Sequence, residues 1–117
     1  MSEKKVELLN SEELAASKKD EKLEELIKII SDEKLMLILK IVFFANGVTS
    51  EILRTRLTIS KKHYYSKLSS LITTGLVKRQ NGKYFITAFG AVVYHAHQIF
   101  ECSVESYWDL TQPIRSN

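Results

Sequence analysis

The sequence predicts a mainly α-helical domain with one small β-hairpin, and three observations support this. Apolar residues recur at helical spacing in several segments, each preceded by a short polar residue of the kind that caps helices. The dipeptide Asn81-Gly82, typical of tight hairpin turns, separates two short runs of strand-forming residues. A length of 117 residues with 44% hydrophobic residues suits a single domain with its own core.

The N-terminal third contains a charged segment followed by two predicted helices. Residues 1–20 mix both signs of charge with little apolar content, so we expect a tail or a marginal helix before a domain at 21–110. Ser31 or Asp32 is the expected cap of the second helix, whose apolar run from Leu35 to Phe44 predicts burial and ends at Asn46-Gly47. The first helix is predicted from four residues at helical spacing: Leu23, Leu26, Ile27 and Ile30.

The centre of the chain predicts two further helices joined by a short turn. Thr49 or Ser50 is the expected cap of the first, which carries Arg54 and Arg56 on its outer side. Ser60 is the expected cap of the second, a helix over about 61–74 that stops at Gly75. Its core face follows helical spacing: Tyr64, Leu68, Leu71 and Ile72.

The C-terminal part predicts a hairpin and a long helix. Residues 76–80 and 83–86 are the expected strands, and Asn81-Gly82 favours a type I′ turn because both central residues need positive φ. Thr87 is the expected cap of the last helix, and residues 111–117 are an expected tail. The helix carries a wide apolar stripe: Phe89, Val92, Val93, Ala96, Ile99, Phe100 and Val104.

The positive charge of the chain is confined to its middle. Residues 1–31 hold six lysines and eight acidic residues, a net charge of −2. Residues 32–100 hold ten Lys or Arg and three acidic residues, a net +7, and residues 101–117 hold one arginine and three acidic residues, a net −2. This segregation suggests a polyanion-binding face on the central module, the alternative being a basic surface that is merely solvated.

The order helix, helix, turn, helix, hairpin, helix resembles the winged helix-turn-helix plan. Leu68, Leu71 and the run 75–77 look like the L-x-x-L-x-x-x-G-L-V signature that ends recognition helices in bacterial and archaeal regulators. Four residues look like the Y-x-[IL]-T-x-x-G that follows the wing: Tyr84, Ile86, Thr87 and Gly90. Residues 61–67, 76–79 and 81–84 resemble a family of small archaeal winged-helix proteins, generally taken to be transcription regulators, and this resemblance extends over about residues 32–110.

This resemblance implies a recognition helix over about 61–74 in the major groove of DNA and a basic wing over 78–83 on the backbone. The candidate DNA-binding residues lie at the helix start and on the wing: Lys61, Lys62, Tyr65, Ser66, Lys67, Lys78, Arg79, Asn81 and Lys83. A solvated polar face is the alternative for the helix, and charge that protects an exposed hairpin edge is the alternative for the wing. Arg54 and Arg56 are further candidates for backbone contact.

The last helix is expected to join two copies of the chain, because its apolar stripe is wider than a small core needs. The expected interface residues are Phe89, Val93, Ile99, Phe100, Val104 and Tyr107. The competing expectation is that the helix over residues 23–30 folds back and covers the same stripe within one chain.

No catalytic or metal-binding pattern is visible in the sequence, which predicts a protein that is not an enzyme and needs no cofactor or metal. The longest apolar run has eleven residues, short of the roughly 20 that span a bilayer, and the lone Cys102 fits a reducing compartment. We therefore expect a cytoplasmic transcription regulator that binds double-stranded DNA as a homodimer. The alternative is a winged-helix adaptor that contacts other proteins.

Overall fold

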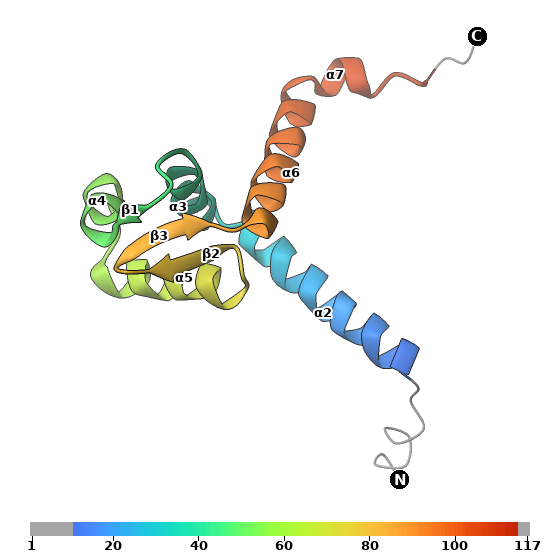
Figure 1. The fold of residues 1–117 in the computed structure, drawn as a ribbon. Helices are drawn as coiled ribbons and strands as arrows, with labels where there is room; N and C mark the ends of the chain where they lie inside the picture. The colour runs from blue at the N-terminus through green and yellow to red at the C-terminus, as the bar shows by residue number, and fades with distance from the viewer. Residues whose placement is uncertain (1–10, 115–117) are drawn as a thin grey trace.

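The computed structural model describes residues 11–114, which form helices and a small sheet (Figure 1). In chain order the elements are α2 (Ser11–Ile30), α3 (Glu33–Phe44), β1 (Val48–Thr49), α4 (Ser50–Arg56), α5 (Lys61–Thr73), β2 (Val77–Gln80), β3 (Lys83–Ile86), α6 (Ala88–Glu105) and α7 (Tyr107–Leu110). Helices α3, α4 and α5 and the sheet form a compact head, from which α2 and α6 project as two arms.

The sheet has three antiparallel strands in the order β1-β3-β2. Val48 of β1 lies opposite Tyr84 of β3, and Val77 of β2 lies opposite Ile86 of β3. Three helices followed by a hairpin that pairs with a short strand between the first two make the winged-helix fold, so the predicted fold class is confirmed. The two-residue strand β1 was not predicted, because its pairing partner lies far along the chain.

The local signals in the sequence explain where the elements begin and turn. Asp32, Thr49, Ser60 and Thr87 each accept a hydrogen bond from a backbone N–H of the helix that follows, which confirms one expected cap for each helix. Asn81 and Gly82 have φ of 53° and 74°, as the predicted type I′ turn requires.

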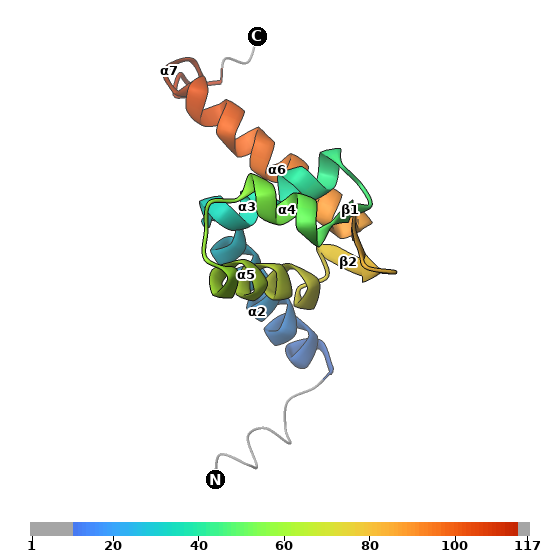
Figure 2. The ribbon, with the colours of Figure 1, turned by 90° about the vertical axis from the view of Figure 1, so that its left-hand side faces the viewer.

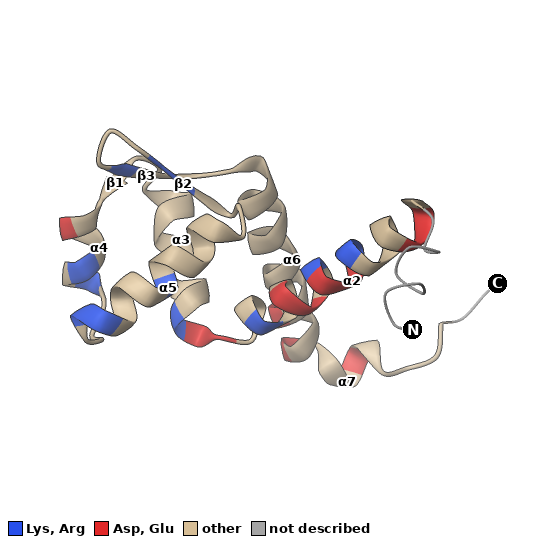
Figure 3. Ribbon diagram, turned by 90° about the horizontal axis from the view of Figure 1, so that it is seen from below, with Lys and Arg blue, Asp and Glu red and all other residues tan. Residues whose placement is uncertain are grey.

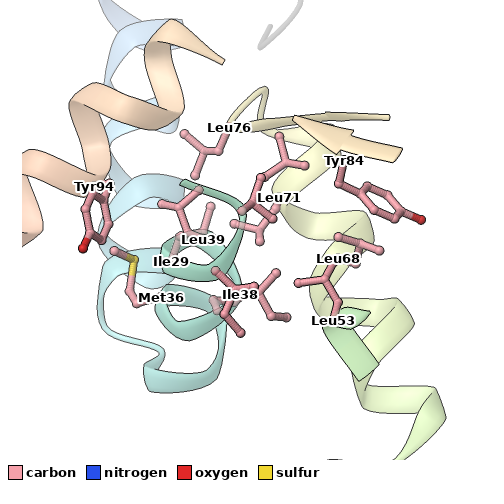
Figure 4. Packing of buried hydrophobic residues seen from close by; sticks show 14 of the residues in the cluster. Ile29, Met36, Ile38, Leu39, Leu53, Leu68, Leu71, Leu76, Tyr84 and Tyr94 are labelled. Carbon is pink, nitrogen blue, oxygen red and sulfur yellow. The ribbon is translucent and has the colours of Figure 1, made fainter. Parts of the chain in front are cut away.

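The core is built around α3, which packs against α5, the sheet and α6, and Ile38, Leu39 and Val42 of α3 are fully buried. Figure 4 shows Ile38 and Leu39 within this core. The predicted core face of α5 is confirmed for Tyr64, Leu68 and Leu71. The prediction was wrong for Ile72, which is 36% exposed because the core ends beside Leu71. The prediction of an apolar helix buried almost all round was wrong at Phe44, which is 68% exposed at the end of α3.

The arms extend well beyond the head, as two perpendicular views show (Figures 1 and 2). The Cα radius of gyration is 18.6 Å, whereas a compact chain of this length has roughly 13 Å. Helix α2 begins at Ser11, so it takes in part of the segment expected as a tail; the rest of that segment, residues 1–10, lies outside the described residues. Since α2 packs on α3 and diverges from α6, it does not cover the stripe of α6 in this arrangement.

Candidate nucleic-acid interface

Helix α5, the predicted recognition helix, is fastened to the rest of the fold at three points along its length. Near its start, the hydroxyl groups of Tyr64 and Ser50 hydrogen bond at 2.8 Å and tie α5 to α4. Near its middle, the ammonium of Lys67 donates to Asp32 at 2.7 Å, and at its end the ammonium of Lys22 donates to the carbonyl of Thr74 at 3.1 Å. These contacts hold α5 in one orientation relative to α2, α3 and α4, which a surface that recognises a rigid partner needs.

The exposed start of α5 carries the side chains that were predicted to contact DNA. Lys61, Lys62, Tyr65 and Ser66 are all exposed, and Tyr65 is 45% exposed with its ring edge-on to the buried ring of Tyr64. The core position predicted for Tyr64 is confirmed. Burial raises the pKa of the Tyr64 phenol, so this group stays protonated and available for its hydrogen bond to Ser50.

Lys67 differs from its neighbours, because its ammonium is already engaged. Its side chain is 23% exposed and pairs with Asp32, which also accepts the N–H groups of Lys34 and Leu35 as the cap of α3. Burial alone would raise the pKa of Asp32, but the hydrogen bonds and charge of Lys67 and the two N–H groups outweigh burial and lower it. Lys67 therefore has a structural partner within the chain, and the set of residues that we propose for DNA contact leaves it out.

A hollow of about 430 Å³ lies between α4 and the start of α5. Arg54 and Lys61 line it together with Tyr65, the hydroxyl of Ser50 and the carboxylate of Glu51. Two cations and hydroxyl groups are the donors that bind phosphate oxygens, so this hollow extends the candidate surface from α5 to α4. From the sequence Arg54 was only a further candidate for backbone contact, because its position at the same hollow as Lys61 depends on how the two helices meet.

The wing is short, and its cations do not all share one face. Alternation along the strands places Arg79 on the side of the sheet that holds buried Val77 and Tyr84, which is the side packed on α3 and α5. Lys78 and Lys83 lie on the opposite side. All three, with Asn81 at the turn, are exposed.

The charges of the described residues separate along the molecule (Figure 3). Lys and Arg outnumber acidic residues on α4, at the start of α5 and on the hairpin, whereas most acidic residues lie on α2, α6 and α7, where α2 also carries lysines. Within residues 11–114, no ion pair engages any of seven cations that we call the basic face: Arg54, Arg56, Lys61, Lys62, Lys78, Arg79 and Lys83. The basic face is therefore not neutralised by carboxylates of the described chain.

The residues predicted to join two copies separate into different environments. Val93 is buried in the head at 7% exposure, so it is unavailable for a contact between copies. Phe89, Ile99, Phe100, Val104 and Tyr107 are between 39% and 72% exposed. Val92 was predicted as part of the apolar stripe but not as an interface residue, and it is 63% exposed.

The described residues contain no group of three His, Cys, Asp or Glu side chains placed to hold a metal ion. His97 instead pairs with Glu101 at 2.8 Å, and His95 lies 3.2 Å from the amide oxygen of Gln98. None of the helices between residues 11 and 114 combines the length and apolar character needed to cross a membrane.

Comparison with known proteins gives a likeness of fold. No protein-family model matches the chain, and no curated protein matches its sequence. A solved structure, the activation domain of the phage T4 transcription factor MotA, superposes with a TM-score of 0.57 and 21% sequence identity, over 78% of this chain and 99% of that one. The fold of this chain is thus shared with a domain of a transcription factor.

Proposed function

We propose that the protein is a transcription regulator that binds double-stranded DNA through the basic face. The observation that carries this proposal is the concentration, on α4, the start of α5 and the wing, of seven cations that no carboxylate of the described residues engages. DNA presents about one negative charge per 1.7 Å of its axis, so such a surface gains affinity by releasing counterions. The likeness to a domain of a transcription factor supports the same role.

In this proposal the exposed start of α5 enters the major groove. Lys62 and Ser66 lie one turn apart on its outer face, where they can reach base edges and phosphates. Arg54, Lys61 and Tyr65 around the hollow, and the wing cations, contact the backbone and set affinity. The regulator acts as a homodimer joined through α6, because large apolar side chains remain exposed along that helix.

Binding of fluorescent duplex DNA, followed by anisotropy across a salt series, tests the proposal. Four phosphate contacts would give a slope of about −3.6 for log affinity against log salt concentration. Lys62→Ala should weaken binding, whereas the matched control Lys19→Ala removes the same charge from the exposed face of α2 and should leave the affinity unchanged. A flat salt response, or equal losses in both variants, would refute the DNA-binding role.

Selection of bound sequences from a random duplex pool tests the division of labour within the basic face. We expect Lys62→Ala and Ser66→Ala to change the selected sequence, since a base contact discriminates by about 1–3 kcal/mol. Arg79→Ala and Lys83→Ala should weaken binding to all sequences alike. The assignment is wrong if the wing variants change the selected sequence and the helix variants do not.

An adaptor that contacts other proteins is the second candidate function. The similar domain of MotA is an activation domain, and α7 of this chain exposes 81% of Trp108. An adaptor has no need of the basic face, so it would bind duplex DNA weakly and without sequence preference. The selection experiment therefore also separates the two functions, because only a DNA-binding regulator should enrich a defined motif.

A further inference from the structure

One exposed side of α6 carries an apolar stripe with the spacing of a coiled-coil seam. Its members follow one another at intervals of three and four residues, and we call them the α6 seam: Phe89, Val92, Ala96, Ile99 and Ser103. This is the heptad pattern of positions that meet between two paired helices. Phe89, Val92 and Ile99 are 39%, 63% and 67% exposed, and Ala96 is exposed between them, so the remainder of residues 11–114 does not cover the seam.

The seam lies on a different side of α6 from the residues that pack on the head. Gly90, Val93 and Tyr94 are the buried residues of α6 and hold its first half against α3 and the sheet. Beyond Gln98 every residue of α6 except Ser103 is exposed. Most helical stability in proteins comes from packing of an apolar face, so a partner on this projecting half would stabilise it.

The distribution of charge around the seam suits a second copy of α6 as the partner. The chain has no Lys or Arg between Lys83 and Arg115, and the carboxylates of α6 at Glu101 and Glu105 lie about 160° around the helix from the seam. Two seams can therefore meet without bringing like charges together, whereas a seam designed for a partner of opposite charge would carry charge of its own. The hydroxyl of Ser103 donates to the carbonyl of Ile99 at 2.7 Å, so its donor is satisfied when water is excluded.

The size of the stripe also suits a pair of copies. With the neighbouring Phe100 and Leu110, each 61% exposed, the seam presents on the order of 500–600 Å² of apolar surface. A stable interface buries roughly 800 Å² per partner, including its polar rim, which His95 and Cys102 beside the seam would supply. Small residues at Ala96 and Ser103 alternate with large ones, which lets two helices approach closely.

We propose that the α6 seam is a two-fold interface at which α6 of one copy packs against α6 of a second copy. The proposed function, on which this proposal rests for its partner, already names a second copy of the chain. The seam specifies which side of α6 makes the contact, and that side carries neither Val93 nor Val104. The proposed contact does not depend on DNA binding, so it can fail while the DNA-binding role stands.

Sedimentation equilibrium of the full chain, without DNA, tests the proposal. We expect a species of twice the 13.5 kDa chain mass. Ile99→Glu places a carboxylate in both seams and should raise the dissociation constant roughly 100-fold or more. The matched control Val104→Glu makes a similar change at a residue that is 72% exposed on another side of the same helix, and should remain dimeric.

Disulfide crosslinking supplies a second readout that does not depend on the glutamate variants. Ala96→Cys in a Cys102→Ser background should oxidise to a covalent dimer if two seams meet there, and a cysteine at Lys19 on α2 should not. A full chain that stays monomeric at high concentration would overturn the proposal. So would a dimer that Val104→Glu dissociates and Ile99→Glu does not.

Discussion

Replacing Gly90 by alanine probes how closely α6 approaches the sheet. A Cβ at this position would lie 2.1 Å from the carbonyl oxygen of Leu76 and 3.0 Å from a side-chain carbon of Ile86. The oxygen cannot move freely, because it accepts hydrogen bonds of 3.1 Å from both the N–H and the hydroxyl of Thr87. The helix and the strand would therefore have to separate by roughly 1 Å.

Two opposing terms decide the size of the effect of Gly90→Ala. Alanine favours the helix by about 1 kcal/mol over glycine. Overpacking costs about 1–3 kcal/mol, and weakening the two hydrogen bonds to Leu76 costs about 1 kcal/mol each. We expect a net loss of about 2–4 kcal/mol in the free energy of unfolding, a large part of the 5–15 kcal/mol of a typical domain.

Urea unfolding followed by circular dichroism measures this loss. Gly82→Ala is a useful contrast, because its φ is 74° but a Cβ there would have no neighbour within 4 Å, so only the left-handed backbone is penalised, by about 1–2 kcal/mol. A Gly90→Ala protein that is more stable than the parent would show that helix propensity dominates. The close approach of α6 to the carbonyl of Leu76 would then be refuted.

Three further changes test the core and the fastening of α5. Asp32→Asn keeps the cap of α3 but removes the charge beside Lys67. Because the pKa of Asp32 is lowered in the folded state, the ionised carboxylate stabilises the fold above its usual pKa of 3.8, and this stabilisation is lost as the pH falls below that value. The difference in urea stability between parent and Asp32→Asn should therefore shrink on acidification below about pH 4, and a constant difference would contradict the ion pair. Leu39→Ala should cost about 2–5 kcal/mol in the same assay, since Leu39 is fully buried, and a loss below 1 kcal/mol would place it outside the core. Tyr64→Phe removes the hydrogen bond to Ser50 and should cost about 1 kcal/mol, while an unchanged stability would mean that this bond does not hold α4 against α5.

Sequence patterns predicted those parts of the fold whose causes are local. Asp32, Ser60 and Thr87 cap helices because their side chains lie within three residues of the N–H groups that they satisfy. The turn at 81–82 follows from the backbone that asparagine and glycine tolerate. The resemblance to a family motif predicted a glycine at position 90 without a physical reason. The reason lies in the fold, because the carbonyl of Leu76 leaves no room for a side chain there.

The parts that were missed depend on contacts between distant residues. Strand β1 forms because Val48 pairs with Tyr84 of β3. Lys67 is left out of the candidate interface because its ammonium forms an ion pair with Asp32. The helical spacing of apolar residues predicted that α6 is apolar on more than one side. It did not predict which side packs against the rest of the fold. Val93 faces inward there, whereas Val92, one residue earlier, faces out.

The basic face lies on the head and most acidic residues lie on the arms, so the distance between them decides how strongly the acidic residues repel a polyanion bound at the head. The molecule extends about 52 Å along its longest axis, whereas the screening length of physiological salt is roughly 8 Å. With the basic face on a polyanion, carboxylates near the ends of α2 and α6 lie several screening lengths away and repel it weakly. In dilute buffer the screening length grows to about 30 Å at 0.01 M salt. The same carboxylates would then repel a polyanion strongly enough to orient the protein with its head toward it. At physiological salt the charges of the arms would therefore have little effect on how tightly the head holds a polyanion.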